Sequence, residues 1–366
     1  MKKFICAALA LMLAAGLTGC GSTPAKKSES ENSSESSSNS SNSSESSKSE
    51  STPPQSDTLV IYSPLPPKLL QAAADNFSAA SGIEVTIISD SSTALLARIA
   101  DKAEPKADVL FGAGAEVVRA NSQQFTPYAG TENGALDPLF LPADELYTPL
   151  TPMPIVLMYN KSQTTQPPTG WANIINSSYR GWVAFASPFS SGTSYTALCI
   201  TQQLKKVLGS EYLNSFCTSI AGKMLPGISD VYKGVANAEF AVGVTLESSA
   251  QKYIDAGYQN VGIVYPEEGT TAALEVSAIV ADTKKEADAR SFIDYVSGAE
   301  FQKLLVSEYK LRTARNDIAD PEGLTPRKSI KFMAYDMEKA VNDRSTLLKK
   351  FNEYEKKATA ALDTSN

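Results

Sequence analysis

Histidine is absent from all 366 residues of this chain. Its absence excludes catalysis that depends on an imidazole acid or base, including the serine–histidine–aspartate type. Cysteine is scarce, with four residues in the chain, and these do not cluster at the spacing of zinc ligands. The sequence therefore predicts no enzyme, no metal site and no cofactor.

Basic residues do not predominate either. The chain has 33 Lys and Arg against 40 Asp and Glu, a formal net charge of −7 that falls on the part after residue 56. Such a balance argues against nucleic acid or an anionic membrane surface as a partner. A small anionic ligand remains compatible, because helix N-termini and backbone dipoles can hold an anion whatever the net charge.

Apolar residues are missing from one long segment. Residues 21–56 contain 17 serines and no Val, Ile, Leu or aromatic residue. They cannot bury enough surface to offset chain entropy, so residues 20–56 are expected to form a disordered spacer. Residues 1–19 before it have a basic start, an apolar run and small residues, the pattern of a secretory signal. The apolar run is shorter than the ~20 residues that span a bilayer.

Residues 17–20 (LTGC) are similar to the lipobox of bacterial lipoproteins, in which the cysteine becomes the lipidated N-terminus. This resemblance implies lipidation of Cys20 and a place on the extracellular face of the cell membrane. With Cys6 in the signal, only Cys199 and Cys217 belong to the folded part. An oxidising location permits a disulfide between them, and two buried free thiols are the alternative.

The folded part opens with three strand-and-helix units. Short apolar strands are expected at 59–62, 83–88 and 108–111, each followed by a helical pattern. Consecutive units of this type predict a parallel sheet with ligands at the carboxyl ends of its strands.

A proline-rich passage over residues 127–154 then leads into an expected crossover strand at 155–159. Further elements build a second lobe before the chain returns: strands at 183–185, 240–244, 261–265 and 276–280, helices at 193–208, 211–221 and 247–256, and a mostly helical stretch at 286–362. The prediction is an α/β fold with hinge strands and a central cleft that closes around a ligand. Lobe 1 is expected to hold residues 57–153 with about 266–315, and lobe 2 residues 154–265 with about 316–362.

The strongest local signal is the corner at residues 187–194 (SPFSSGTS), between an expected strand and helix. Hydroxyls and amide donors at a helix N-terminus suit phosphate, phosphonate or carboxylate. Ordinary helix capping is the alternative, but one hydroxyl is enough for a cap. The hydroxyls beyond the one needed for a cap favour a ligand site. Its candidate residues are Ser190, Ser191, Gly192, Thr193 and Ser194.

Corners of the first lobe face the same way by topology. Alone, each is a cap or a turn, but their joint placement opposite the serine-rich corner favours ligand contact. The candidates are Ser63, Ser91, Ser92, Thr93, Gly112 and Gly114.

Four more residues follow strands or lie near the chain's late turns. Thr245 and Glu247 end a strand, and a carboxylate there would accept hydrogen bonds from a ligand; a solvated first-turn glutamate is the alternative. Tyr265 follows the next strand. Arg312 would give an anion a bidentate contact, with a surface salt bridge as the alternative.

Taken together, these segments resemble the extracellular solute-binding proteins of ABC importers, in the branch related to ferric-iron-binding proteins. The resemblance covers nearly all of residues 59–355 and is carried by these stretches: 59–64 (LVIYSP), 82–85 (GIEV), 107–112 (ADVLFG), 190–198 (SSGTSYTAL), 242–247 (VGVTLE) and 265–270 (YPEEGT). It implies a two-lobed type II periplasmic-binding-protein fold and a monomer that delivers its ligand to a membrane permease.

The departures from that branch bear on the ligand. Its iron binders use a histidine near the first strand and a tyrosine pair where residues 247–249 read ESS here. The anion-holding part does match, so the resemblance gives that role to residues 191–194, and also to 91–93. Relatives of this kind bind organic phosphates or phosphonates, which is the expected ligand class. A ferric iron–anion importer and a sensor that presents ligand to a membrane kinase are the alternatives.

Overall fold

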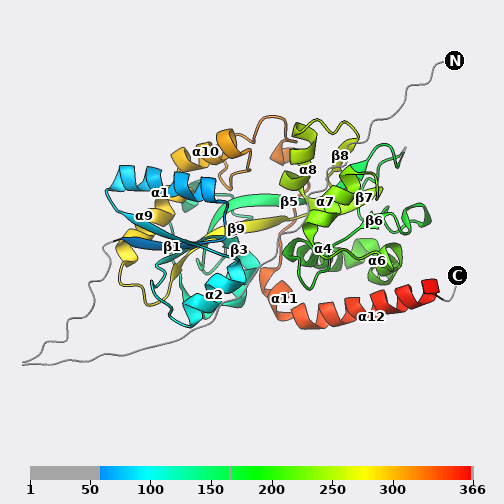
Figure 1. The fold of residues 1–366 in the computed structure, drawn as a ribbon, viewed down its shortest axis with the longest axis horizontal. Coiled ribbons are helices and arrows are strands. Elements are labelled where there is room, and N and C mark those ends of the chain that lie inside the picture. Colours follow the sequence, from blue (N-terminus) through cyan, green and yellow to red (C-terminus); the bar gives the residue numbers. More distant parts are fainter. Residues whose placement is uncertain (1–57, 165, 364–366) are drawn as a thin grey trace, which may run out of the picture. The chain divides into compact units, whose positions relative to one another are not determined.

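The computed structural model describes residues 58–164 and 166–363. They form two α/β lobes joined by strands that run from one to the other (Figure 1). The expected signal, spacer and lipidated Cys20 lie outside the described residues. Among the helices within the described ranges, none is both long and apolar enough to cross a membrane.

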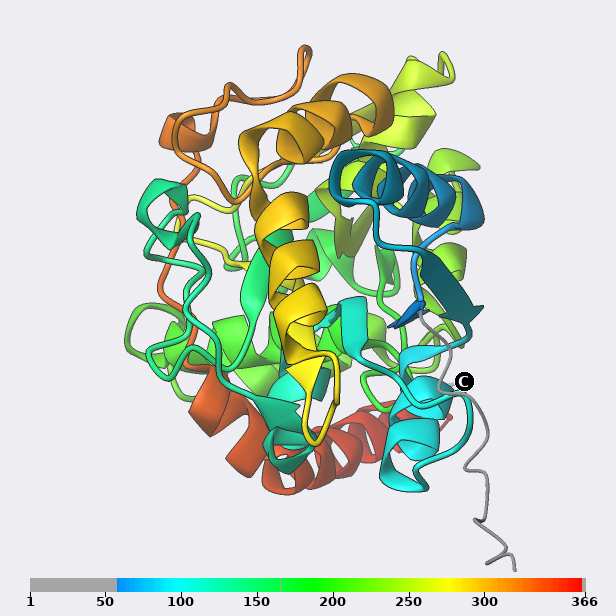
Figure 2. The same cartoon turned by 90° about the vertical axis from the view of Figure 1, so that its left-hand side faces the viewer.

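Lobe 1 is a sheet in which three parallel strands each lead into a helix. Strand β1 pairs in parallel with β2 and β3, which confirms the predicted parallel sheet. Helices α1, α9 and α10 cover one face, while α2 and α3 lie against the other (Figure 2). The elements are β1 (Leu59–Ser63), α1 (Pro67–Ser81), β2 (Val85–Ser89), α2 (Ser92–Ala100), β3 (Val109–Gly114), α3 (Ala115–Ala120), β4 (Phe125–Thr126), β9 (Ala272–Val280), α9 (Glu286–Ser297) and α10 (Ala299–Tyr309).

Lobe 2 is built on the strand that leaves lobe 1. Strand β7 lies between β5 and β6, antiparallel to the first and parallel to the second. The elements are β5 (Thr148–Asn160), β6 (Val183–Ala184), α4 (Gly192–Gln203), α5 (Lys205–Leu208), α6 (Tyr212–Ile220), α7 (Ile228–Ala236), β7 (Val242–Leu246), α8 (Glu247–Asp255), β8 (Val261–Val264), α11 (Met337–Asn342) and α12 (Arg344–Asp363).

Strands β5 and β9 connect the lobes side by side. They pair antiparallel in lobe 1, and the Ile155 amide donates to the Thr271 carbonyl at 3.0 Å where the pair ends. A third crossing runs beside them, because Thr270 bridges to Phe332 in the late part of the chain. These crossings are the expected hinge strands.

The end of the proline-rich passage, from Thr148, is strand, contrary to the expectation that the crossover strand begins at Ile155. Strand β5 starts at Thr148 and pairs Pro149, Pro152 and Pro154 with β9. Proline is tolerated because β5 is the last strand of the lobe 1 sheet, so its missing N–H groups interrupt no second ladder.

Two other expectations about helices were wrong. Helix α4 ends at Gln203 rather than continuing to residue 208, and α5 follows as a separate turn. Helix α7 was not expected at all, since its apolar residues form only a short pattern. The last stretch, 286–362, is mostly helical as expected. Its part 310–336 has only a short 3-10 turn, and it bonds to both lobes, through Arg312 to Glu247 and through Arg315 to Glu132.

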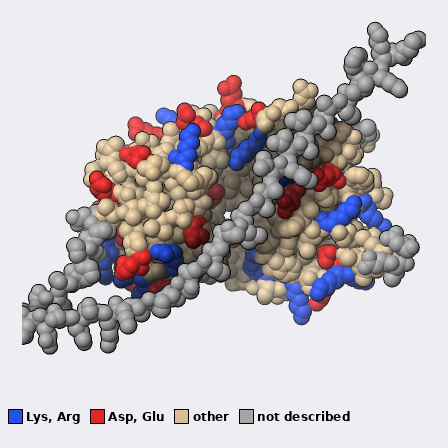
Figure 3. All heavy atoms as spheres, viewed as in Figure 1, with Lys and Arg blue, Asp and Glu red and all other residues tan. Residues whose placement is uncertain are grey.

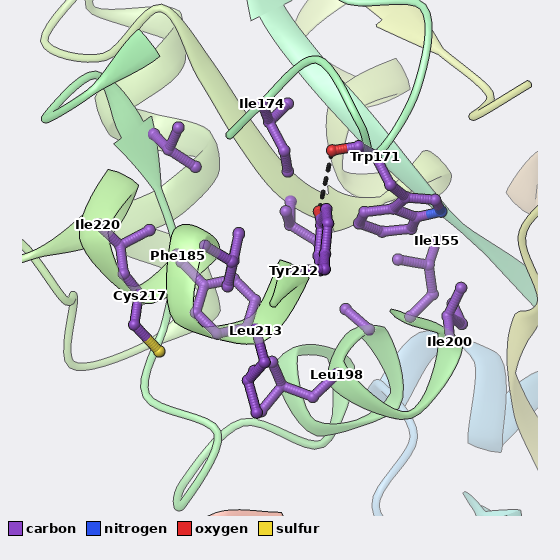
Figure 4. Close-up of a cluster of buried hydrophobic side chains, with 14 of the residues drawn as sticks. Ile155, Trp171, Ile174, Phe185, Leu198, Ile200, Tyr212, Leu213, Cys217 and Ile220 are labelled. Atoms are coloured by element: carbon purple, nitrogen blue, oxygen red, sulfur yellow. Dashed lines mark hydrogen bonds between the residues drawn. The ribbon is translucent and has the colours of Figure 1, made fainter. Parts of the chain in front are cut away.

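The larger core of lobe 2 is aromatic. Phe185 packs edge-on against Phe216 with ring centroids 4.9 Å apart, and Tyr212 donates to the Trp171 carbonyl at 2.9 Å (Figure 4). The Trp171 indole N–H donates to the Gly269 carbonyl at 2.9 Å. Every buried aromatic polar group named here thus has a partner, and the core is tied to the segment that leads into β9.

Both cysteines of the folded part are free and buried, which is the second of the two alternatives. Burial raises the pKa of Cys199 to about 11 and that of Cys217 to about 12, so neither is a thiolate at neutral pH. We expect iodoacetamide to leave the native protein unmodified and to alkylate both thiols in urea without reductant. A protein that reacts in urea only after reduction would contradict this, and intact mass gives the readout.

Candidate functional site

The strand-to-helix corners of each lobe lie along one edge of its sheet. This follows from the parallel pairing of β1 with β2 and β3, and of β6 with β7. One contact brings the two edges together, since the Thr196 hydroxyl on α4 donates to Glu116 Oε1 on α3 at 2.7 Å. Figure 3 shows a furrow at the boundary between the lobes, with both acidic and basic side chains beside it. The start of α3 in lobe 1 therefore lies close to the first turns of α4 in lobe 2.

The N-terminus of α4 is capped and still has donors to spare. Ser191 Oγ accepts the Ser194 amide at 3.2 Å and the Ser194 hydroxyl at 3.1 Å, so these two hydroxyls hold each other. The amides of Gly192 and Thr193 have no partner among the described residues, as expected for a first helical turn. Gly192 is exposed, and a Cβ there would meet nothing within 4 Å. Two amide donors at the positive end of a 12-residue helix thus open onto free space.

Two of the predicted hydroxyls are used inside the fold. Ser63 is fully buried; its hydroxyl donates to the Phe111 carbonyl at 2.6 Å and accepts the Leu65 amide at 3.2 Å. Ser190 is exposed and donates to the Pro226 carbonyl at 3.1 Å. Both fix the shape of their corners.

The remaining lobe 1 corners have clear local roles. Ser91 caps α2 by accepting the Ala94 amide, and Ser92 and Thr93 lie in its first turn with no hydrogen bond to their hydroxyls among the described residues. Gly114 is the N-cap of α3. Gly112 has a φ of +77°, and a Cβ there would lie 2.3 Å from the Leu65 side chain, so only glycine fits.

Glu247, Tyr265 and Arg312 come together as a buried cluster. Arg312 donates two hydrogen bonds, of 2.7 and 2.8 Å, to the Glu247 carboxylate, and the Tyr265 hydroxyl donates to the same carboxylate. Arg312 also donates to Asp320 at 2.5 Å and to the Thr325 carbonyl at 2.5 Å. The side chains of Arg312 and Glu247 are 1% and 2% exposed. The cluster ties the start of α8 to the segment after α10.

The neighbouring carboxylates keep Arg312 charged in this cluster. Burial acts to lower the pKa of Arg312, but the bonds to and charge of Glu247, together with Asp320, raise it above its ordinary value. Burial and the neighbouring carboxylate raise the pKa of Tyr265, which stays a neutral donor. Because Arg312 already serves two carboxylates and a carbonyl, its charge is balanced within the protein.

Thr245, the residue two before Glu247, is fully buried, and its hydroxyl has no hydrogen-bond partner among the described residues. It lies on β7 opposite Val156 of β5. Its place near the carboxyl end of β7 agrees with the expected corner, although its hydroxyl is covered.

Glu116 is a site residue that the sequence analysis missed. Its Oε1 accepts from Thr196 and from the Tyr335 hydroxyl, so it joins α3, α4 and the segment before α11. Burial raises its pKa, while these two donors and Arg344 act to lower it. A glutamate in the first turn after a strand was the available signal, but such a residue also occurs as ordinary compensation of the helix dipole.

Glu275 was missed as well. It lies on β9, paired with Gly114 of β3 and with Thr151 of β5. It is half-buried, and its carboxylate forms no hydrogen bond or ion pair with the described residues. Burial raises its pKa to about 7, and Lys252 of α8 acts to lower it. The signal was a charged residue inside an apolar run, hidden because the strand was expected to begin only at Val276.

A cavity of about 360 Å³ adjoins β9 and the start of α11. It is lined by Arg119, Tyr147, Leu274, Tyr335 and Met337, among others, and by none of the predicted site residues. Arg119 is held by Asp144 at 2.5 Å, so its charge is matched there. In the described part of the chain, no three His, Cys, Asp or Glu side chains are grouped to hold a metal ion.

Residues 59–308 match the family model described as bacterial extracellular solute-binding protein. The match spans more than half of the chain, and the protein belongs to this family. A protein of Haemophilus influenzae, described as uncharacterized, is 27% identical over 193 residues, which are 50% of this chain and 54% of that relative. The chain thus spans about half the length of the curated relative that it matches.

Solved structures show the fold. AfuA, a periplasmic binding protein from Actinobacillus pleuropneumoniae with exogenous fructose-6-phosphate bound, is 21% identical with a TM-score of 0.67, over 82% of this chain and 98% of AfuA. A Trichodesmium protein (IdiA, FutA) in complex with iron and citrate is 17% identical with a TM-score of 0.71, over 81% of this chain and 99% of its own. The predicted two-lobed type II periplasmic-binding-protein fold is confirmed.

Proposed function

We propose that this protein is the solute-binding component of an ABC importer, which captures a small organic phosphate or phosphonate between its lobes and delivers it to a membrane permease. The protein has no catalytic role in this proposal. It acts as a monomer on the extracellular face of the cell membrane, anchored by lipid on Cys20, a residue outside the described part of the structure.

The observation that carries the proposal is the N-terminus of α4. The Gly192 and Thr193 amides point from an exposed helix start with no partner of their own, while Ser191 already satisfies the third amide. Amide donors of this kind, together with the helix dipole, bind phosphate and related anions without a metal. The likeness to a fructose-6-phosphate-bound protein supports the same ligand class.

Iron remains the second candidate because another structural neighbour holds iron with citrate. The anion of such a complex would use the same helix start. No metal-holding group of side chains is present among the described residues, so the ferric ion would depend on its chelating anion.

The test removes the backbone N–H donor of Gly192 while keeping helix α4 intact. Gly192→Pro deletes the donor at the first helical position, where proline is tolerated, and Ser191 already has the extended conformation that precedes proline (φ −107°, ψ 113°). Gly192→Ala keeps the donor and meets no neighbour. A charged hydrogen bond contributes about 1.5–3 kcal/mol, so we expect Gly192→Pro to weaken binding roughly 10- to 100-fold and Gly192→Ala to leave it within about twofold.

Isothermal titration with ethyl phosphate, glucose 6-phosphate and ferric citrate gives the affinities. Native mass spectrometry of freshly purified protein first identifies any solute already carried. Equal solute affinity of the two Gly192 variants would contradict an anion site at the start of α4. Tight binding of ferric citrate alone would show that the protein binds iron with its chelating anion instead of an organic phosphate.

A further inference from the structure

We propose that Glu275 selects the solute, and that this solute is a zwitterion whose protonated amine pairs with Glu275 while its anionic group lies at the start of α4. The inference deepens the proposed function and rests on it. It adds a chemical requirement for one residue that no hydrogen bond or ion pair of the fold explains.

Glu275 stands where the two lobes meet. Its strand, β9, runs between them, and its neighbours across the sheet are Gly114, where α3 begins, and Thr151 of β5. Lys252, whose charge acts on it, comes from α8 of the other lobe. Because side chains alternate along a strand, Glu275 lies on the face of β9 opposite the buried Leu274 and Val276.

The carboxylate has no partner that would account for it structurally. Buried or half-buried carboxylates are normally paired or hydrogen-bonded, because desolvating a charge is costly. Lys252 is exposed and forms no ion pair with Glu275 within 4.0 Å, and Glu275 accepts no hydrogen bond from the described residues. Groups perturbed in this way concentrate at functional sites.

The charge balance around the boundary favours a cation on the solute. Arg312, the buried cation nearest the start of α8, is matched by Glu247 and Asp320. Glu116 adds another carboxylate where α3 meets α4. Arg344 acts on Glu116, whereas Glu275 has no ion-pair partner among the described residues. A solute that brought only negative charge would leave Glu275 unpaired, whereas an amine on the same molecule would pair with it.

The experiment compares solutes that differ only in the amine. Binding of phosphoethanolamine and ethyl phosphate, and of glucosamine 6-phosphate and glucose 6-phosphate, is measured on the wild type, Glu275→Gln and Glu308→Gln. Glu308 is an exposed glutamate of α10 with no bond to the described residues, and serves as the matched control.

We expect the wild type and Glu308→Gln to prefer the aminated member of at least one pair by roughly 10- to 100-fold, the range for a charged hydrogen bond. Glu275→Gln should reduce that ratio to about one while leaving ethyl phosphate affinity unchanged. The wild-type preference for phosphoethanolamine over ethyl phosphate should also grow between pH 6 and pH 8, as Glu275 ionises, and this growth should vanish in Glu275→Gln.

Two failures are distinguishable. If aminated and plain solutes bind the wild type equally, or if Glu275→Gln keeps the preference, the inference is overturned while the anion site stands. If no phosphate solute binds, or Gly192→Pro has no effect, the proposed function fails and the inference falls with it. Thermal unfolding of Glu275→Gln without solute verifies that the variant is folded.

Discussion

Arg312→Met should be the most destabilising of the substitutions considered, by about 3–5 kcal/mol in the free energy of unfolding. The substitution removes the cationic partner of the Glu247 carboxyl group, whose side chain is only 2% exposed. The remaining donor, Tyr265, is neutral and provides a single hydrogen bond. Urea unfolding at pH 7 measures the loss.

Matched variants separate the lost pair from lost packing. Glu247→Gln should cost less, because Arg312 keeps Asp320 and the Thr325 carbonyl. The double variant Arg312→Met with Glu247→Leu should regain most of the stability, because apolar residues of similar volume often replace a buried ion pair without loss. A cost below about 1 kcal/mol for Arg312→Met would show that water reaches Glu247 in solution.

A second large effect is expected when pH changes the free energy of unfolding. The pKa of Glu275 is raised from 4.5 to about 7 by burial, so the folded protein holds this proton more tightly than the unfolded chain does. Stability contributed by the protonated form is therefore complete below pH 4.5 and is lost as pH rises through 7. A shift of this size corresponds to at most roughly 3 kcal/mol, and partial exposure to solvent reduces it to about 1–2 kcal/mol.

Glu275→Gln should remove most of this pH dependence and make the solute-free protein more stable than the wild type at pH 8. Glu116, whose pKa is also raised by burial, contributes in the same direction and remains in the variant. Urea unfolding of both proteins at pH 5 and pH 8 gives the four values needed. Parallel losses in the two proteins would show that Glu275 is well solvated.

A variant that gains stability and loses solute preference would have the profile of a binding residue. Functional groups are often retained at a cost to stability, since a site must offer unpaired groups to its ligand. A purely structural carboxylate would behave in the opposite way, because its replacement would break contacts.

Much of the fold could be predicted because its signals are local. Strand β1 is a short apolar run, and Gly82 ends α1 in the left-handed conformation (φ 76°) that glycine favours. Ser191 was correctly expected at a helix start, where its hydroxyl caps α4. Local rules of this kind place the corners at one edge of each sheet.

Other features depend on contacts that sequence distance conceals. Arg312 and Glu247 are 65 residues apart, and only the folded chain shows that each neutralises the other. The three prolines of β5 argued against a strand until its place at the end of the lobe 1 sheet was known. Local patterns carry no information on either point.

The candidate site was predictable in part for the same reason. The residues at helix starts were found from capping patterns, but Ser63 proved to be committed to the Phe111 carbonyl. Glu116 and Glu275 were missed because their roles depend on which lobe faces them. Glu275 in particular lies in a strand whose first half was not expected.

The chain's two tryptophans give it an internal optical probe. Trp171 is 1% exposed and bonded to the Gly269 carbonyl ahead of β9, whereas Trp182 is 44% exposed. Both belong to lobe 2, so intrinsic fluorescence reports one half of the molecule without any label. Acrylamide quenches the emission of an exposed indole and spares a buried one, and the unquenched fraction therefore follows the segment next to the hinge.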